Sequence, residues 1–390
     1  MPDFLSESRL LFDYTRALRR DFHRHPELGF AEVRTSGIVA QELKKLGLEV
    51  QTGVGKTGVV GLLEGGQPGP AVLIRVDMDA LPIQEETGAE YASTVTGVMH
   101  ACGHDGHTAI GLTVARLLNQ HRDQLKGSVK FVFQPAEEGL GGAEAMLEDG
   151  LMRNPSPDIA LSVHLWNEKP LGWIGVTPGP VMAAADIFRI QLQGKGGHGA
   201  QPHLAVDPVA ASAQIISALH TIVSRNVPPL DAAVVSVTML RTGEAFNVIP
   251  DTAELQGTIR TFNNEVRQRV VERFKQIVEG ISAAMGCQAA IEHQSITPAV
   301  VNDPQVTALV QEICAQVLPE SQVDDHTSTM GSEDMAFIMQ AVPGCYILVG
   351  SANSEKGLDA SHHHPRFDVD EESMTHAAAL LAAITTKILS

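Results

Sequence analysis

In the first 180 residues, segments whose hydrophobic side chains are spaced as in a helix alternate with short apolar runs that are typical of strands. Residues 35–50, TSGIVAQELKKLGLEV, space their apolar side chains as an amphipathic helix that ends near Gly47. The runs VVGLLEG (59–65) and AVLIRVDMD (71–79) are short and rich in β-formers. Because the turn-forming stretch GQPGP separates these two runs, they are predicted to be neighbouring strands.

The same alternation continues to about residue 166. The stretch DGHTAIGLTVARLLNQH (105–121) predicts a long helix, with Asp105 near its start. SVKFVFQPAEE (128–138) and IALSVHLW (159–166) have the nearly continuous apolar character of buried strands. Strands that alternate with helices predict an α/β domain with a largely buried, parallel or mixed sheet.

After residue 183 the pattern changes. A strand leads into a glycine-rich loop in IFRIQLQGKGGHGAQPH (187–203), and long helices are predicted from Pro208 to about Arg225 and over roughly 264–285. Further strands are predicted in AVVSVTML, AELQGTIRTF and CQAAIEHQSIT. This set is large enough for a separate α+β domain.

Beyond that point, VTALVQEICAQVL and CYILVG again show the alternation of helix and buried strand that is predicted for the first 180 residues. We therefore expect one α/β domain, formed by residues 1–182 and 296–390, that is interrupted by an inserted α+β domain at 183–295.

The composition is that of a globular protein and argues against a nucleic-acid-binding one. The chain is 44% hydrophobic and 19% charged, which is typical of a globular protein. It has 28 Lys and Arg against 46 Asp and Glu, a formal net charge of −18. Because an acidic surface repels phosphate backbones, nucleic acid is not expected as a partner.

The N-terminal residues, the hydropathy and the cysteines bear on where in the cell the protein is expected. The first residues carry acids and no apolar signal-peptide core, and no run of eighteen apolar residues predicts a membrane span. The four cysteines, at 102, 287, 314 and 345, are too scattered for a disulfide framework. A reducing cytoplasm is the expected location, without a membrane partner.

The candidate chemistry begins with HACGHDGH, residues 100–107. Thiolate and imidazole are the usual ligands of zinc-like metals, and Cys102-x-His104 lets two donors from one turn face a common point. Neither a hydrophobic core nor a solvated loop requires such a cluster. The motif therefore predicts part of a metal site.

The predicted strands deliver further donors. In open α/β sheets functional groups collect at the carboxyl ends of the strands. The strand at 71–79 ends in Asp77 and Asp79, that at 128–138 ends in Glu137 and Glu138, and that at 159–166 contains His164. Together with the HACGHDGH loop, four segments bring donors to one edge.

Each of these residues also has an ordinary explanation when it is considered alone. Adjacent acids such as Glu137 and Glu138 usually form a solvated face, and His164 could be a satisfied core histidine. Cys102 could be a small buried apolar residue, and the loop SHHHPRFD (361–368) could be exposed without a role. Because four segments converge on one edge, a metal site is favoured over the alternative that all of these ordinary explanations hold at once.

Six motifs in this order also resemble a known family: DMDALP, HACGHDGHTA, QPAEEG, GKGGHGAQPH, FNVIP and HHPRFD. The chain is similar over essentially its whole length to the metal-dependent aminoacylase, hippurate hydrolase and auxin-conjugate (IAA-amino acid) hydrolase family of amidohydrolases and carboxypeptidases. The resemblance implies a zinc-peptidase-like catalytic domain with an inserted ferredoxin-like lid domain that commonly dimerises.

The resemblance also implies a role for each motif residue. The metal ligands would be the following five: Cys102, which would bridge two cations, and His104, Glu138, His164 and His363. In HHHP the family's ligand stands two residues before the proline, which selects His363 over its neighbours. Glu137 takes the place of the catalytic base, and Asp79, rather than Asp77, that of the acid orienting a ligand.

The implied reaction is hydrolysis of an N-acyl amino acid at two divalent cations, which could be zinc, manganese, cobalt or nickel. Glu137 would accept a proton from the attacking water and pass it to the leaving nitrogen. The lid's His198 would stabilise the oxyanion, reaching the site of a second subunit in related enzymes. Asn247 and Arg260 would bind the amino acid's carboxylate, although Arg260 taken alone could be a solvated strand arginine.

Two alternatives stay open at this level. A dipeptidase or carboxypeptidase could use the same residues with a different acyl pocket. A non-catalytic metal-binding or amino-acid-binding protein could keep the scaffold, but it would not need Glu137 beside a ligand. The expected partners are thus a small N-acyl amino acid or dipeptide and a second copy of the chain.

Overall fold

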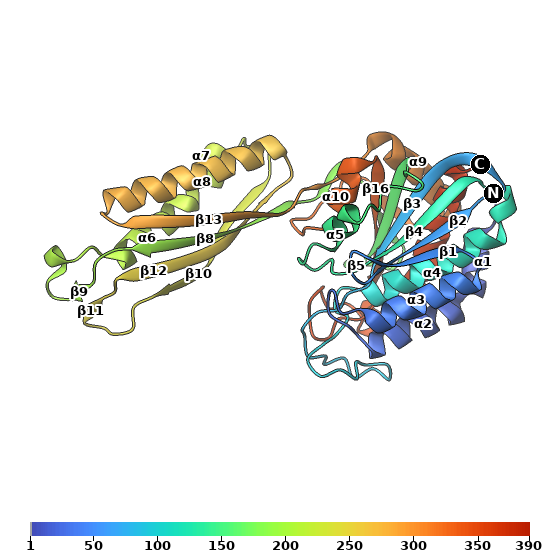
Figure 1. Cartoon of the computed structure of the whole chain (residues 1–390), viewed down its shortest axis with the longest axis horizontal. Coiled ribbons are helices and arrows are strands. Elements are labelled where there is room, and N and C mark those ends of the chain that lie inside the picture. The colour runs from blue at the N-terminus through green and yellow to red at the C-terminus, as the bar shows by residue number, and fades with distance from the viewer. Residues whose placement is uncertain (1) are drawn as a thin grey trace. The chain divides into compact units, whose positions relative to one another are not determined.

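The computed structural model describes residues 2–390, and these form two compact units (Figure 1). Unit 1 contains the described residues up to Val181 together with Val300–Ser328 and Glu333–Ser390. Unit 2 contains Met182–Ala299 and Thr329–Ser332, compared with the inserted range 183–295 expected from the sequence. The short second segment belongs to unit 2 because the Ala183 N–H donates to the carbonyl oxygen of Gly331 at 2.8 Å.

Unit 1 is built on an eight-stranded sheet. In spatial order its strands are β1 (Glu49–Val54), β2 (Gly58–Glu64), β4 (Lys126–Gln134), β3 (Gln67–Asp77), β5 (Ile159–Pro170), β16 (Gly344–Ala352), β6 (Trp173–Gly175) and β15 (Gln322–Asp324). Strands β4, β3, β5 and β16 run parallel, and the β1–β2, β2–β4 and β16–β6 pairs are antiparallel. The predicted mixed sheet is confirmed.

One prediction about this sheet was wrong. Strands β2 and β3 are consecutive in the chain but not neighbours, because β4 lies between them. It pairs antiparallel with β2, with Val59 opposite Phe133, and parallel with β3, with Ile74 opposite Phe131. The turn signal between the two runs marks where the chain bends, and it contains no information about which later strand is inserted.

Most helices of unit 1 cover one side of this sheet. They are α1 (Phe4–Leu10), α2 (Phe12–Arg24), α3 (Val33–Lys45), α4 (His104–Gln120), α9 (Pro304–Val317) and α11 (Glu372–Ile388). Helices α4 and α11 contact each other and are buried over most of their length, which explains their many Ala and Leu residues. The shorter elements are α5 (Gly142–Glu148), α10 (Met335–Ala341), η1 (Arg122–Gln124), η3 (Ser354–Lys356), β7 (Gly179–Met182) and β14 (Val300–Asn302).

Unit 2 has a four-stranded antiparallel sheet. Its strands, in spatial order, are β10 (Ala233–Thr242), β12 (Thr252–Thr261), β8 (Ala184–Gln193) and β13 (Gln288–Thr297). Its other elements are α6 (Pro208–Leu219), α7 (Thr221–Asn226), α8 (Asn264–Ala284), η2 (Pro202–Leu204) and the two-stranded pair β9 (Gly197–His198) and β11 (Val248–Ile249). The βαββαβ order of the main elements is that of a ferredoxin-like fold, as the resemblance implied.

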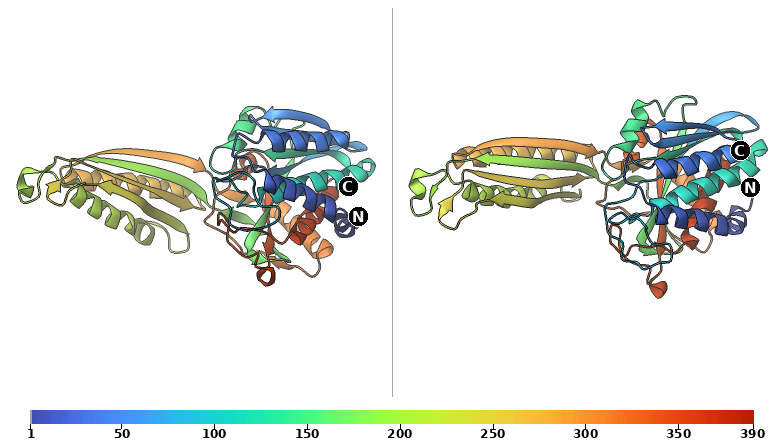
Figure 2. Two further views of the ribbon diagram at one scale, coloured as in Figure 1. Left: turned by 90° about the horizontal axis from the view of Figure 1, so that it is seen from below. Right: turned by 60° about the horizontal axis from the view of Figure 1, so that its bottom comes forward.

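The helix predicted from Pro208 to about Arg225 is divided into α6 and α7 at His220. The Thr221 hydroxyl donates to the Ala218 carbonyl at 2.7 Å, a local bond of the kind that competes with regular helix bonding. The helices cover one face of the sheet, as Figure 2 shows, and the core between them includes Phe188 and Phe274, with ring centroids 4.5 Å apart.

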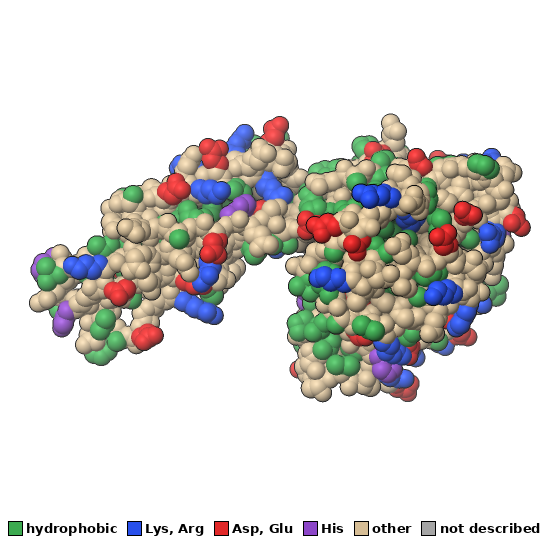
Figure 3. All heavy atoms as spheres, viewed as in Figure 1, with side chains coloured by type: hydrophobic (Ala, Val, Ile, Leu, Met, Phe, Trp, Pro, Cys, Tyr) green, Lys and Arg blue, Asp and Glu red, His purple; other side chains and the backbone are tan. Residues whose placement is uncertain are grey.

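Acidic and basic side chains are mixed over the face of each unit that Figure 3 shows. Among residues 2–390 we find no helix whose length and apolarity would let it cross a membrane.

Candidate metal centre

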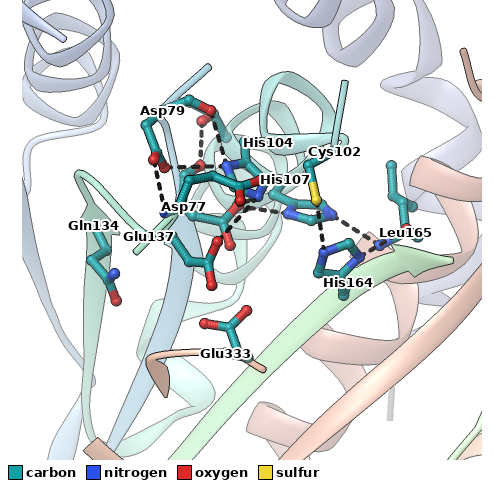
Figure 4. Close-up of polar contacts among 12 residues, drawn as sticks. Asp77, Asp79, Cys102, His104, His107, Gln134, Glu137, His164, Leu165 and Glu333 are labelled. Carbon is teal, nitrogen blue, oxygen red and sulfur yellow. Dashed lines mark hydrogen bonds and ion pairs between the residues drawn. The ribbon is translucent and has the colours of Figure 1, made fainter. Parts of the chain in front are cut away.

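The parallel strands of unit 1 bring several predicted site residues to one edge of the sheet. Strands β4, β3 and β5 are adjacent. The carboxyl ends of β4 and β3 lead into Glu137 and Glu138 and into Asp79, and His164 lies within β5, two residues beyond the last pair of the β3–β5 ladder. Figure 4 shows the side chains of Asp79, Glu137 and His164 converging with Cys102, which precedes α4, and His104, which begins it. The geometry follows from the rule that parallel strands present their carboxyl ends at a common edge.

Gly103 makes the turn between Cys102 and His104 compact. It precedes α4 in a left-handed conformation with φ of 94°, which a residue without a side chain adopts at low cost. The turn places the Cys102 Sγ 3.6 Å from Nε2 of His164. One donor atom from each of Cys102, His104 and His164 lies within 4.8 Å of the others.

Asp79 holds two predicted ligands with one carboxylate. Its Oδ1 lies 3.2 Å from Nδ1 of His104, which also donates to the Asp79 carbonyl oxygen at 2.9 Å. Its Oδ2 accepts the Glu138 N–H at 3.0 Å. Asp79 is buried, so these bonds are protected from water. The arrangement is that of an orienting acid behind a metal ligand.

The two glutamates follow a strained position. Ala136 has φ of 54°, an uncommon conformation for a residue with a side chain, and its N–H donates to Glu32 Oε1 at 2.8 Å. Beyond this bend, Glu137 Oε2 lies 4.0 Å from His104 Nε2, and Glu138 Oε1 lies 3.1 Å from His363 Nε2. The bend therefore directs both carboxylates towards the histidines.

The loop 361–368 contributes two histidines to the cluster. His363 has φ of 64° and its N–H donates to the Ala101 carbonyl at 2.7 Å, while its side chain is 53% exposed. One donor atom from each of Cys102, Glu138 and His363 lies within 4.8 Å of the others. His362 also approaches the Cys102 Sγ, at 3.8 Å, but its Nε2 accepts the Asn167 N–H at 3.1 Å.

The donors at this edge fit divalent cations. His104 and His164 donate from Nδ1 to the carbonyl oxygens of Asp79 and Leu165, so each presents an unprotonated Nε2 towards the cluster when neutral. The Nε2 of His104 is buried without a hydrogen-bond partner. Orphaned buried acceptors are costly, and a set of thiolate, imidazole and carboxylate donors suits zinc-like metals.

The electrostatics of the cluster favour positive charge. Burial first, and then the carboxylates of Glu333 and Glu138, raise the pKa of Glu137 well above its usual range. Burial lowers the pKa of His104, but the charges of Asp77 and Cys102 more than offset this effect and leave the pKa well above its usual value. Hydrogen bonds with Cys102 and Glu138 raise the pKa of His363 to about 10.

His164 differs from His104 and His363 in the direction of its pKa shift. Burial and then the neighbouring His107 and His362 hold its pKa well below the usual value. Its imidazole is therefore neutral at physiological pH, as a metal ligand must be.

A buried network behind the cluster was missed by the sequence reasoning. The fully buried guanidinium of Arg75 donates to Gln134, Asp77, Glu333 and Asp334 at 2.7–3.0 Å. Tyr346 donates to the other oxygen of Glu333 at 2.6 Å. A charged residue in the apolar run AVLIRVD was the available signal, because a buried arginine requires acidic partners.

The remaining predicted site residues lie in unit 2. His198 in β9 and Asn247 beside β11 are close together, since Gly199 donates to the Asn247 carbonyl at 2.8 Å, and both line a groove of about 980 Å³. Arg260 on β12 lines a different groove of about 460 Å³. It is half-buried, and its Nη1 donates to the Thr258 hydroxyl and to the Ile259 carbonyl.

Comparisons with known proteins agree with this geometry. The model of peptidase family M20/M25/M40 matches residues 73–387. The chain is 42% identical to N-acetylcysteine deacetylase of Bacillus subtilis, covering 95% of this chain and 96% of the relative. It is 39% identical to thermostable carboxypeptidase 1 of Saccharolobus solfataricus, covering 98% and 97%.

A solved structure of a similar protein has the same fold. A dinuclear metal-binding peptidase of the M20 family from Bacillus subtilis superposes with a TM-score of 0.85 at 38% identity, covering 98% of this chain and 99% of that one.

Proposed function

The chain belongs to peptidase family M20/M25/M40, and from this premise we propose that it is a metal-dependent hydrolase that cleaves the amide bond of N-acyl amino acids. The products would be a carboxylic acid and a free amino acid. The observation that carries the proposal is the meeting of Cys102, His104, His164, Glu138 and His363 at one sheet edge, with Glu137 beside them.

We propose that these five residues hold two divalent cations, with Cys102 shared between them. The overlapping donor groups support this arrangement, since Cys102 belongs both to the group with His104 and His164 and to the group with Glu138 and His363. Bound cations would polarise the scissile carbonyl and increase the acidity of a water molecule. Zinc, manganese, cobalt and nickel all suit a site of mixed sulfur, nitrogen and oxygen donors.

Glu137 is proposed as the general base. Its raised pKa suits a group that accepts a proton from the attacking water and then delivers it to the leaving nitrogen. Its neighbour Glu138 is fixed through the main chain by Asp79, so the carboxylate of Glu137 is held next to the ligands. A protein that only bound metal would not need this second carboxylate.

Three residues of unit 2 are proposed to contact the substrate. His198 would donate to the oxygen that becomes negative during attack, and Arg260 and Asn247 would bind the free carboxylate of the amino acid. Arg260 supports this role because its partners in unit 2 are a hydroxyl and a carbonyl rather than an acid, which leaves its charge available. Assembly into a homodimer through unit 2 and a cytoplasmic location stay predictions.

A carboxypeptidase activity is the second candidate, because the 39% identical relative carries that name and a free carboxylate would be recognised in both cases. One panel of substrates separates the two. Metal-free protein is reconstituted separately with zinc, manganese, cobalt or nickel. Each form is then assayed with N-acetyl, N-benzoyl and N-indoleacetyl amino acids and with dipeptides.

We expect turnover of at least one N-acyl amino acid in a metal-dependent manner, with free amino acid as the measured product. Hydrolysis of dipeptides alone would favour the carboxypeptidase or dipeptidase reading. Metal binding without turnover of any substrate in the panel would favour the binding-protein alternative.

A further inference from the structure

His107 lies in the HACGHDGH motif but is not among the predicted ligands, and it bridges two strands of unit 1. We propose that Asp77 and His107 form a positioning pair that holds the main chain of β5 at His164. The inference rests on the proposed function, because it takes His164 to be a metal ligand. Neither residue would touch the substrate.

The hydrogen bonds of His107 define its role. Its Nδ1 lies 2.6 Å from Asp77 Oδ1, and its Nε2 accepts the Leu165 N–H at 2.8 Å. Since a main-chain N–H can only donate, Nε2 must be unprotonated and Nδ1 must carry the proton that Asp77 accepts. Figure 4 shows this chain of contacts from β3 through α4 to β5.

The sheet explains why a side chain is needed at this point. Strands β3 and β5 pair in parallel only as far as Arg75 opposite Ser162. Three residues further along β5, the Leu165 N–H bonds to the imidazole of His107 instead of to a neighbouring strand. His107 thereby extends the support of the ladder to the residue that directly follows His164.

The position of Leu165 matters for His164. The Nδ1 of His164 donates to the Leu165 carbonyl at 2.8 Å, and its Nε2 is the nitrogen that faces Cys102. The rings of His107 and His164 are also in edge contact, with centroids 4.5 Å apart. A displacement of Leu165 would therefore rotate or shift the predicted ligand.

Asp77 is itself immobilised. Arg75 Nη1 donates to its Oδ2 at 2.7 Å, and the Thr108 hydroxyl donates to its carbonyl oxygen at 2.9 Å. Helix α4 approaches β5 closely at Gly106, where an added Cβ would lie 2.7 Å from a methyl carbon of Leu165. The side chains of Asp77 and His107 are both fully buried, so the pair is rigid as well as dry.

Two substitutions of His107 separate its bond to Leu165 from its bond to Asp77. In His107→Gln the amide oxygen reaches the place of Nε2 and can accept the Leu165 N–H. In His107→Asn the amide nitrogen takes the place of Nδ1 and can donate to Asp77, but the side chain is too short for Leu165. The asparagine variant should bind Co²⁺ roughly 10- to 100-fold more weakly than the wild type, the usual range for loss of a group that orients a ligand.

The glutamine variant should stay within about threefold of the wild type, because the bond to Leu165 is retained. Affinity is measured by competition with a chromophoric chelator, and the visible absorption of bound Co²⁺ reports ligand geometry independently of activity. Thermal unfolding of the metal-free variants checks that both are folded. Equal affinities for the two variants, whether both are normal or both are reduced, would overturn the inference.

If the asparagine variant does not fold, His107→Ala replaces it, with imidazole or pyrrole added to fill the space. Imidazole offers an acceptor for Leu165 and should restore Co²⁺ affinity, whereas pyrrole has no such acceptor and should not. Equal restoration by both compounds would contradict the positioning role. Failure of the wild type to bind any cation would instead contradict the proposed function.

Discussion

The candidate residues of unit 1 are buried or partly buried and held by partners, apart from the exposed His363, whereas His198 and Asn247 of unit 2 are open to solvent. In unit 1, the Asp79 carboxylate orients His104 and also bonds to the main chain of Glu138. In unit 2, His198 and Asn247 are exposed, and the Nδ1 of His198 accepts a bond only from Ala200, two residues away.

This difference in burial corresponds to two different roles, catalysis with cation binding in unit 1 and substrate binding in unit 2. Groups that transfer protons or bind cations must be held in one geometry before the substrate arrives, which requires burial and orienting partners. Groups that bind a charged ligand from solution can remain exposed until it is present. We therefore expect unit 1 substitutions to change the rate of the chemical step, and substitutions of the carboxylate-binding residues Arg260 and Asn247 of unit 2 to change mainly substrate affinity.

The largest effect is expected for Glu137→Gln, which keeps the shape of the side chain but removes its ability to accept a proton. Loss of a general base typically lowers kcat by roughly 10²- to 10⁴-fold. Metal affinity should be nearly unchanged, because Glu137 is not among the predicted ligands. Steady-state kinetics and metal titration of the same preparation measure both quantities.

Glu148→Gln, at an exposed position on α5, is the matched control and should retain wild-type kcat. Near-normal kcat in Glu137→Gln would remove the basis for assigning the chemical step to this carboxylate.

A second, smaller effect concerns the stability of unit 1 in acid. His100 is buried, both of its ring nitrogens lack a hydrogen-bond partner, and burial lowers its pKa to about 4 from the ordinary 6.5. The unfolded chain therefore binds a proton between pH 6.5 and 4 that the folded protein does not. Stability is thus lost as the pH falls through this window, by about 2 kcal/mol at pH 5.

His100→Phe should remove this part of the pH dependence, since phenylalanine does not titrate. Urea unfolding of the metal-free protein at pH 7 and pH 5 measures the difference. His326→Ala provides a control, because the His326 side chain is 91% exposed in the same unit. An unchanged pH dependence in His100→Phe would show that other buried groups are responsible.

The smallest effect is expected in unit 2. Arg260→Ala should raise KM for an N-acyl amino acid roughly tenfold and change kcat less, because it removes a charge-assisted bond to the carboxylate. Arg189→Ala, on the adjacent strand β8, is a suitable control because Arg189 is already paired with Glu254 at 2.7 Å. A collapse of kcat with unchanged KM in Arg260→Ala would contradict the division of work between the units.

Much of the fold could be predicted because the relevant signals are local. Helical spacing located α3, and its end near Gly47, without any tertiary information. The mixed sheet followed from apolar strands alternating with helices. Sequence alone could not indicate that β4 lies between β2 and β3, since the pairing of strands depends on segments that are distant in the chain.

The same distinction applies to the candidate centre. Residue types and motif order singled out Cys102 and His104, because few structural roles require thiol and imidazole so close together. His107 in the same motif was not assigned, since its partners Asp77 and Leu165 come from two different strands. The residue type alone does not show which groups, distant in the chain, will form hydrogen bonds with that side chain.

Local patterns in the sequence predicted most of the elements and the class of fold, and they marked the candidate donor residues, because periodicity and side-chain chemistry are properties of short segments. The order of the strands, the inclusion of Thr329–Ser332 in unit 2 and the network from Arg75 through Asp77 to His107 became visible only in the folded chain. These features depend on which buried polar groups meet after folding, and burial makes each unpaired group too costly to leave unsatisfied.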